Sequence, residues 1–161
     1  VSWTNKIHSK PETKGSGIAI SAEENLAIVH NHYENIFQYI ERLNRYTEIQ
    51  SKELIQSGYK FKWNDLITKP TGEFLSRFFA NRGFEDGVFG LSLSLLQAFS
   101  FLAVYLKVWE EEKFQNQDLT LKELNEVKNK MGDEINWWFK YGKLSRNPLK
   151  RFFQKVSNKL H

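Results

Sequence analysis

Apolar side chains recur at three- and four-residue steps between His32 and about Ser57. This spacing places them along one face of a helix with about 3.6 residues per turn. Asn31 with Glu34 offers a capping box at the start of this stretch, and Gly58 follows it. The pattern predicts one long helix with these residues on its apolar face: Tyr33, Ile36, Phe37, Ile40, Leu43, Tyr46, Ile49 and Leu54.

Residues 1–30 have a different pattern, in which Pro11 and the glycines of residues 15–17 separate short apolar pieces around Ile7 and Ile18–Ile20. We expect short strands and loops there. The stretch Leu26–Val29 allows two interpretations, a strand or a helix that begins with a capping box at residues 21–24. The second capping box directly after it favours the strand.

Two apolar helices are predicted in the middle of the chain. Thr71 can cap a short helix that ends at Gly83 and carries Phe74, Leu75, Phe78 and Phe79. Asp86 then precedes Gly87–Leu106, a stretch without formal charge that is about 30 Å long if helical. Its length permits a membrane span, but its serines and glutamine make a buried or half-immersed helix the favoured interpretation.

The last third of the chain predicts two further helices. Thr120 with Glu123 forms a capping box before a helix that continues through Trp138. Pro148 opens the final helix, and every formally charged side chain from residue 139 onward is basic. Apolar and basic residues on opposite faces are typical of a helix that lies in a lipid headgroup layer. We expect the membrane contact to involve Phe78, Phe79, Phe152, Phe153, Lys150 and Arg151.

Composition narrows the classes of function. The chain of 161 residues has no cysteine, which excludes disulfides, thiolate metal sites and cysteine nucleophiles. Its net charge of +4 favours an anionic partner, and its 15% of aromatic residues favours an interface-seeking protein. Binding of nucleic acid is not expected, because no RNA-binding signature occurs and glutamates are scattered through most of the chain.

Several short motifs occur in order over residues 1–110. They are Trp3 with Ile7-His8, His30-x-His32-Tyr33, Arg42-Leu43-Asn44-Arg45-Tyr46-Thr47, Pro70 and Phe74 with Arg77-Phe78-Phe79, Gly83-Phe84-Glu85-Asp86-Gly87 with Gly90, and Tyr105-Leu106-Lys107-Val108-Trp109-Glu110. In this order they resemble the C-terminal region of family 2 glycosyltransferases that build bacterial lipopolysaccharide and other surface glycans. The sequence departs from the family at Ser9, where a glutamate is expected after the histidine.

The resemblance implies a parent enzyme that moves a sugar from a nucleotide sugar to a glycan or lipid-linked acceptor. Its catalytic half would be a GT-A type α/β domain in which an Asp-x-Asp motif binds Mg²⁺ or Mn²⁺. No Asp-x-Asp occurs in this sequence. Because the metal neutralises the diphosphate leaving group, this segment alone should be inactive. The implied location is the cytoplasmic face of the bacterial inner membrane, as a peripheral protein.

Four candidate sites each have a functional and a structural interpretation. His8 can bind the donor diphosphate or its metal, or lie in a surface loop. His30 and His32 have a spacing compatible with metal binding on a strand, but no further ligand completes such a site. Arg42 and Arg45 can hold a phosphate or an acceptor carboxylate, or pair with Glu41 or Glu48. Asp86-Gly87 is better explained as a helix cap with a tight turn than as a catalytic base.

The fold prediction is a mainly α chain with a few short N-terminal strands (α+β). Residues 1–30 would finish the catalytic domain, 31–112 would form a helical region with apolar helices, and 113–161 would end in the basic amphipathic helix. The predicted function is the membrane-associated, acceptor-side part of a glycosyltransferase without its nucleotide-binding half. The alternative is a non-catalytic helical module that binds a membrane or a partner protein.

Overall fold

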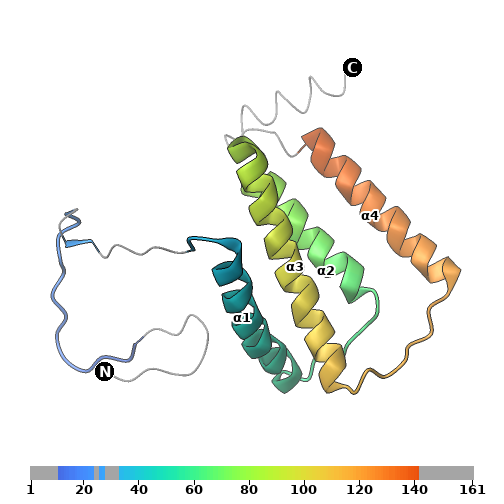
Figure 1. Ribbon diagram of the computed structural model, residues 1–161, viewed down its shortest axis with the longest axis horizontal. Coiled ribbons are helices and arrows are strands. Elements are labelled where there is room, and N and C mark those ends of the chain that lie inside the picture. Colours follow the sequence, from blue (N-terminus) through green and yellow to red (C-terminus); the bar gives the residue numbers. More distant parts are fainter. Residues whose placement is uncertain (1–10, 24–25, 28–32, 142–161) are drawn as a thin grey trace.

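The computed structural model describes residues 11–23, 26–27 and 33–141. The described chain is mainly helical, which confirms that part of the prediction. Its elements in order are α1 (Ile36–Gln56), α2 (Asp65–Leu75), the π-helix η2 (Ser76–Ala80), the 3-10 helix η3 (Gly83–Asp86), α3 (Gly87–Glu111) and α4 (Leu121–Tyr141) (Figure 1).

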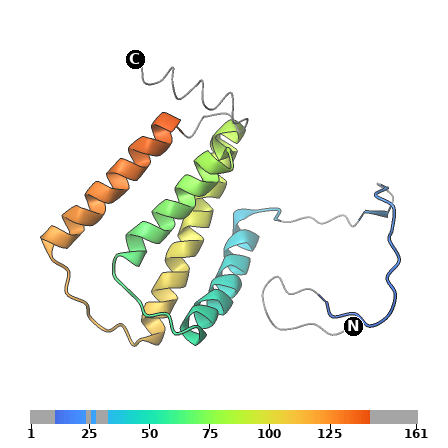
Figure 2. The ribbon, with the colours of Figure 1, turned by 180° about the vertical axis from the view of Figure 1, so that it is seen from behind.

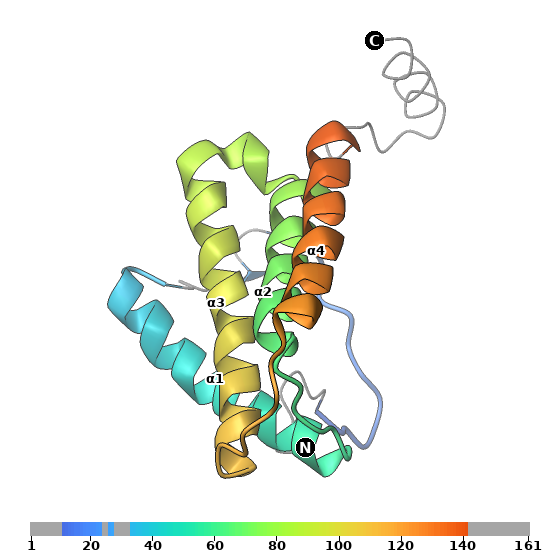
Figure 3. The same ribbon diagram turned by 90° about the vertical axis from the view of Figure 1, so that its right-hand side faces the viewer.

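The helices form an open array in which α1 packs on α3, α3 packs on α2, and α2 packs on α4. Helices α1 and α3 run in one direction, and α2 and α4 run in the opposite direction (Figures 1 and 2). Figure 3 shows α2 between α3 and α4. Because the array is open, a large part of the inner helix α3 remains uncovered.

The N-terminal region differs from the prediction. Residues 11–23 contain an isolated bridge at Glu12 and no strand. Ile18 and Ile20, expected in a strand, are 93% and 72% exposed, so no neighbouring element covers them there. Leu26 and Ala27 lie in a helical turn and a bend. The remaining strand predictions, at Ile7 and residues 28–30, fall outside the described residues.

Helix α1 confirms the long helix and corrects its start. Asn35, and not Asn31, is the N-cap, and its side chain accepts a hydrogen bond of 2.9 Å from the backbone N–H of Gln38. Gly58 follows the helix in the left-handed region at φ 84°, as the sequence predicts. The buried positions are Leu43, Thr47 and Ser51, whereas apolar residues of the first turns are exposed because α3 does not cover them.

Helix α2 corrects the prediction that Thr71 begins a helix. The helix begins at Asp65 and includes both Pro70 and Thr71. Proline inside a helix removes one backbone hydrogen bond. Helix α2 nevertheless continues through Pro70, packed on α3 and on α4. Direct continuation into η2 then carries the aromatic residues 78 and 79 to the end of the array.

The two loops at the other end of the array are joined by polar contacts. The Tyr59 hydroxyl donates a hydrogen bond of 2.7 Å to Asp65, which is only 4% exposed. Gln117 accepts from the backbone N–H of Trp63 at 2.9 Å and donates to the backbone oxygen of Phe61 at 2.8 Å. The two bonds of Gln117 fix the α1–α2 connection against the α3–α4 connection, and the bond between Tyr59 and Asp65 holds the α1–α2 connection on the start of α2.

Helix α4 begins where the sequence predicts. The backbone N–H of Glu123 donates to the Thr120 hydroxyl at 3.2 Å, and the backbone N–H of Thr120 donates to the Glu123 carboxylate at 3.1 Å. This reciprocal pair is a capping box. Because both partners lie within four residues, the sequence alone was enough to locate it.

Candidate functional site

A pocket lies where η2 and η3 meet the first turns of α1 and α3. Its lining residues come from four separate segments and are Tyr33, Tyr39, Arg77, Asn81, Gly83, Asp86, Gly90, Leu93, Ser94 and Gln97. Tyr33, Arg77, Gly83, Asp86 and Gly90 belong to the motifs that carry the family resemblance, and Tyr33 comes from a motif more than 40 residues before the others. The fold therefore brings motif residues that are apart in sequence to one place.

Close backbone packing shapes this pocket. Gly90 on α3 touches the backbone of η3, and an ideal β-carbon on it would overlap the carbonyl oxygen of Gly83. Gly87, at φ 59°, forms the tight turn between η3 and α3 that the sequence predicts. Arg82 precedes η3 in the left-handed conformation and pairs with Glu85. The glycines of this motif thus have a structural reason to be there.

Asp86 occupies the N-cap position of α3 but does not act as predicted. Its side chain makes no capping hydrogen bond. The structural interpretation of this residue as a cap is therefore only partly correct, since the position is right and the bond is absent. The carboxylate instead lines the pocket with Arg77 and Tyr39.

Tyr39, Gln97 and Arg77 line the same pocket as Asp86. The Tyr39 hydroxyl lies 3.4 Å from the side-chain oxygen of Gln97, in position to donate to it. Burial raises the pKa of Tyr39 above its ordinary value, and nearby Tyr33 raises it further, so this phenol stays protonated at neutral pH. Arg77 donates to Glu73 at 2.7 Å, which balances its charge.

Arg42 and Arg45, predicted to bind substrate, line a separate polar hollow on α1 with Gln38 and Glu41. The Arg42 guanidinium carbon lies 5.0 Å from the centroid of the Tyr33 ring, and that of Arg45 lies 5.7 Å from the Tyr46 ring. Both distances are in the range of cation–π contacts. The two guanidinium groups share one surface, so their joint role in anion binding stays a prediction.

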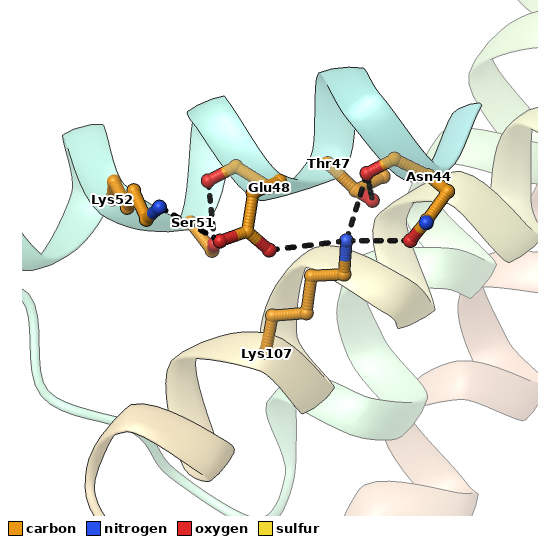
Figure 4. A network of polar contacts seen from close by, with 6 residues as sticks. All are labelled: Asn44, Thr47, Glu48, Ser51, Lys52 and Lys107. Atoms are coloured by element: carbon orange, nitrogen blue, oxygen red, sulfur yellow. Dashed lines mark hydrogen bonds and ion pairs between the residues drawn. The ribbon is translucent and has the colours of Figure 1, made fainter. Parts of the chain in front are cut away.

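Glu48, a predicted alternative partner of these arginines, pairs with lysines instead. Figure 4 shows the network, in which Glu48 lies 2.9 Å from Lys52 and 3.4 Å from Lys107. Hydrogen bonds from Lys52 and then from Lys107 lower the pKa of the Glu48 carboxyl. The Lys107 ammonium also donates to the backbone and side-chain oxygens of Asn44, each at 2.8 Å. Asn44 and Lys107, which both belong to the motifs of the family resemblance, thus join α1 to α3.

The predicted membrane contacts have different outcomes. Phe79 is 3% exposed and packs its ring 5.9 Å from Trp138 and 5.1 Å from Phe139. Phe79 is therefore a core residue, and it is not available for the surface contact that the sequence predicts. Phe78 is half-buried and stacks on Phe74 at 5.4 Å. Phe152, Phe153, Lys150 and Arg151 lie outside the described residues.

An apolar surface that the sequence analysis did not single out lies on α3. Val88, Leu95, Phe99 and Leu106 are 78%, 54%, 47% and 38% exposed and share one side of the helix. We call these four residues the outer face of α3. The opposite side, which includes Gly90, Ser94 and Ala98, is buried. Only the packed structure distinguishes the two sides, because both are uncharged.

The stretch Gly83–Glu111 is long and apolar enough to cross a membrane by length and composition. Core helices of soluble proteins can pass the same test. In this stretch, however, only 22% of the most apolar window is buried inside the protein. The apolar character of α3 is therefore only partly used for internal packing.

The histidine and metal predictions are not tested by the described residues. His8, His30 and His32 lie outside them. Within the described part of the chain, no three or more histidine, aspartate or glutamate side chains gather in a group able to hold a metal ion. The Mg²⁺ or Mn²⁺ of the parent enzyme therefore stays a prediction.

No protein-family model, curated protein or solved structure matches this chain.

Proposed function

We propose that this chain is the C-terminal, membrane-associated part of a family 2 glycosyltransferase. In this proposal a catalytic half transfers a sugar from a nucleotide sugar to a glycan or lipid-linked acceptor. The chain described here rests on the anionic cytoplasmic surface of the membrane and forms part of the acceptor side. The observation that carries the membrane association is the outer face of α3.

Burial of the outer face of α3 in lipid would provide a driving force for membrane binding. Full burial of a leucine or phenylalanine side chain contributes about 1.5–3 kcal/mol. Leu95 and Phe99 are each about half exposed, so immersing them would contribute roughly 1 kcal/mol apiece. The net charge of +4 would add attraction to anionic lipid.

The neighbours of α3 support a peripheral position over a spanning one. Helix α1 packs along α3 and carries charged side chains, and Lys107 of α3 itself bonds to Asn44 and lies near Glu48. A spanning α3 in this array would draw those charges into the hydrocarbon, which is unfavourable. With α3 lying along the surface, only its uncharged outer face needs to enter the lipid.

Two observations support the proposal that this chain forms part of the acceptor-binding side of the enzyme. Motif residues from separate segments of the sequence line one pocket, as described above. That pocket includes residues from the N-terminal part of α3, the same helix that presents the outer face. Because Gly90 and Ser94 lie on the side of α3 opposite the outer face, an acceptor would enter the pocket from beside the helix while α3 holds the chain at the membrane, at high effective concentration.

Liposome pelleting tests the membrane contact. We expect the full chain to pellet with vesicles of phosphatidylcholine and phosphatidylglycerol, and Leu95→Ser with Phe99→Ser to weaken partitioning by about 2 kcal/mol, or roughly 30-fold. Leu121→Ser is the matched control, because Leu121 is 85% exposed on α4 and lies outside this face. Unchanged pelleting of the double variant, or an equal loss in the control, would refute the role of α3.

The same assay tests the C-terminal basic helix predicted from the sequence. Serine at both Phe152 and Phe153 should also reduce pelleting with these vesicles. If pelleting stays at the wild-type level, the interfacial role of that helix is wrong.

The transferase part needs a different experiment. The protein in its full genomic context should turn over a nucleotide sugar in the presence of Mg²⁺ or Mn²⁺, and chelation should abolish that activity. A full gene product with no nucleotide pocket and no turnover would instead support the non-catalytic membrane- or partner-binding module.

A further inference from the structure

The pocket between α1, η2, η3 and α3 has the chemistry of a ligand site. Its volume is about 330 Å³, at the small end of the range of roughly 300–1,000 Å³ typical of ligand pockets. A pocket of this size has room for one or two sugar rings. The pocket is also distinct from the polar hollow of Arg42 and Arg45.

The lining offers both hydrogen-bond donors and acceptors. Asn81 and Gln97 carry an amide group that can do both, and Asp86 can only accept when ionised. The Tyr39 phenol is protonated at neutral pH and can both donate and accept. Such a mixture suits a ligand with many hydroxyl groups, since each hydroxyl also donates and accepts.

The charge of the lining argues against a phosphate. Arg77 is the cation of the pocket, and its guanidinium already bonds to Glu73 at 2.7 Å. Asp86 adds a negative charge that no capping bond uses. Within the lining the charges of Arg77 and Asp86 cancel, so a neutral ligand is favoured over an anion.

The aromatic residues complete the site. The rings of Tyr33 and Tyr39, both among the lining residues, lie 4.9 Å apart and are tilted by 60°. Tyrosine presents a large apolar face together with a polar hydroxyl. A sugar ring has the complementary shape, because its C–H face is apolar and its edge carries hydroxyl groups.

We propose that this pocket binds a neutral sugar ring, with Asp86, Asn81 and Gln97 bonding its hydroxyl groups and Tyr39 contacting its apolar face. This inference rests on the proposed function for its biological meaning, in which the bound ring is the acceptor sugar. Binding itself requires neither the catalytic half nor a membrane.

Saturation-transfer NMR on the full chain tests the proposal. The probes are the methyl glycosides of glucose, galactose, mannose and N-acetylglucosamine, with glucose 1-phosphate as the anionic comparison. We expect saturation transfer to at least one glycoside, and Asp86→Ala to weaken that binding at least fivefold. Asp133→Ala is the matched control, since Asp133 is an exposed aspartate on α4. Circular dichroism confirms that both variants are folded.

Three results would overturn the proposal. These are no transfer to any of the four glycosides, an equal change in the Asp86 and Asp133 variants, or binding of glucose 1-phosphate alone. The outcome is separable from the proposed function, because liposome binding can be lost while sugar binding persists, and sugar binding can fail while the outer face of α3 still binds lipid.

Discussion

Gly90→Ala probes the contact that holds η3 against α3 and shapes the pocket. Gly90 is buried near the start of α3. A β-carbon added there would lie 2.7 Å from the carbonyl carbon of Gly83, 3.0 Å from the β-carbon of Asp86, and would overlap the Gly83 oxygen. Because the Gly83 atoms are backbone, no side-chain rotation can relieve the overlap.

The magnitude follows from two opposing effects. Alanine is favoured over glycine inside a helix by up to about 1 kcal/mol. Overpacking a buried contact costs about 1–3 kcal/mol and sometimes more, and a clash between two backbones belongs at the upper end. We therefore expect a net loss of roughly 1–2 kcal/mol in the free energy of unfolding. For a chain of this size, that corresponds to a fall in Tm of about 2–4 °C per kcal/mol.

Gly132→Ala is the matched control. Gly132 also lies inside a helix, α4, but nothing surrounds its added β-carbon within 4 Å. Here only the helix propensity acts, so stability should rise by about 0.5–1 kcal/mol. Urea and thermal unfolding followed by circular dichroism measure both variants. If Gly90→Ala is as stable as Gly132→Ala, the close contact between Gly83 and Gly90 does not exist.

Two further predictions concern hydrogen bonds. Thr120→Ala should destabilise α4 by about 1 kcal/mol, because it removes the hydroxyl that caps the backbone N–H of Glu123 and bonds the Glu123 carboxylate. The Thr120 bonds lower the pKa of Glu123, so the part of the stabilisation that depends on the Glu123 carboxylate is present at neutral pH and lost as the pH falls below the ordinary glutamate value of 4.5. NMR titration should show the Glu123 pKa rising in Thr120→Ala, and an unchanged pKa would contradict the capping box. Tyr59→Phe should cost about 1–3 kcal/mol in urea unfolding, since buried Asp65 loses a partner, whereas Tyr46→Phe at an exposed site should cost little. Burial and then the bond to Asp65 raise the Tyr59 pKa, so its contribution is present below pH 10.0 and falls at more alkaline pH. An equal stability loss in the two tyrosine variants would rule out a special role for the Asp65 bond.

The candidate site was predictable only in part. Gly83, Asp86, Gly87 and Gly90 stood out as a motif and the turn at Gly87 was predicted, but the close contact between Gly83 and Gly90 became evident only in the folded chain. Tyr39 and Gln97 carried no sequence signal of a site. They meet because α1 and α3 run side by side, although 58 positions separate them in the chain.

The sequence alone determined features whose partners are near in the chain. The Thr120–Glu123 box, the left-handed Gly58 and the turn at Gly87 each depend on a few neighbouring residues, so short-range chemistry is sufficient to predict them. The long apolar character of α3 was also evident, because no formally charged residue interrupts it between residues 87 and 106.

Only the tertiary structure decided which apolar and polar surfaces are used. Packing on α4 buried Phe79, which the pattern had placed at a membrane. Packing between α3 and α4 likewise kept Pro70 inside α2. The order α1–α3–α2–α4 left the outer face of α3 uncovered. The residues of that face and those of the buried side of α3 are alike in being uncharged. The physical reason is that burial depends on what the rest of the chain places against a residue, and periodicity within one helix does not contain that information.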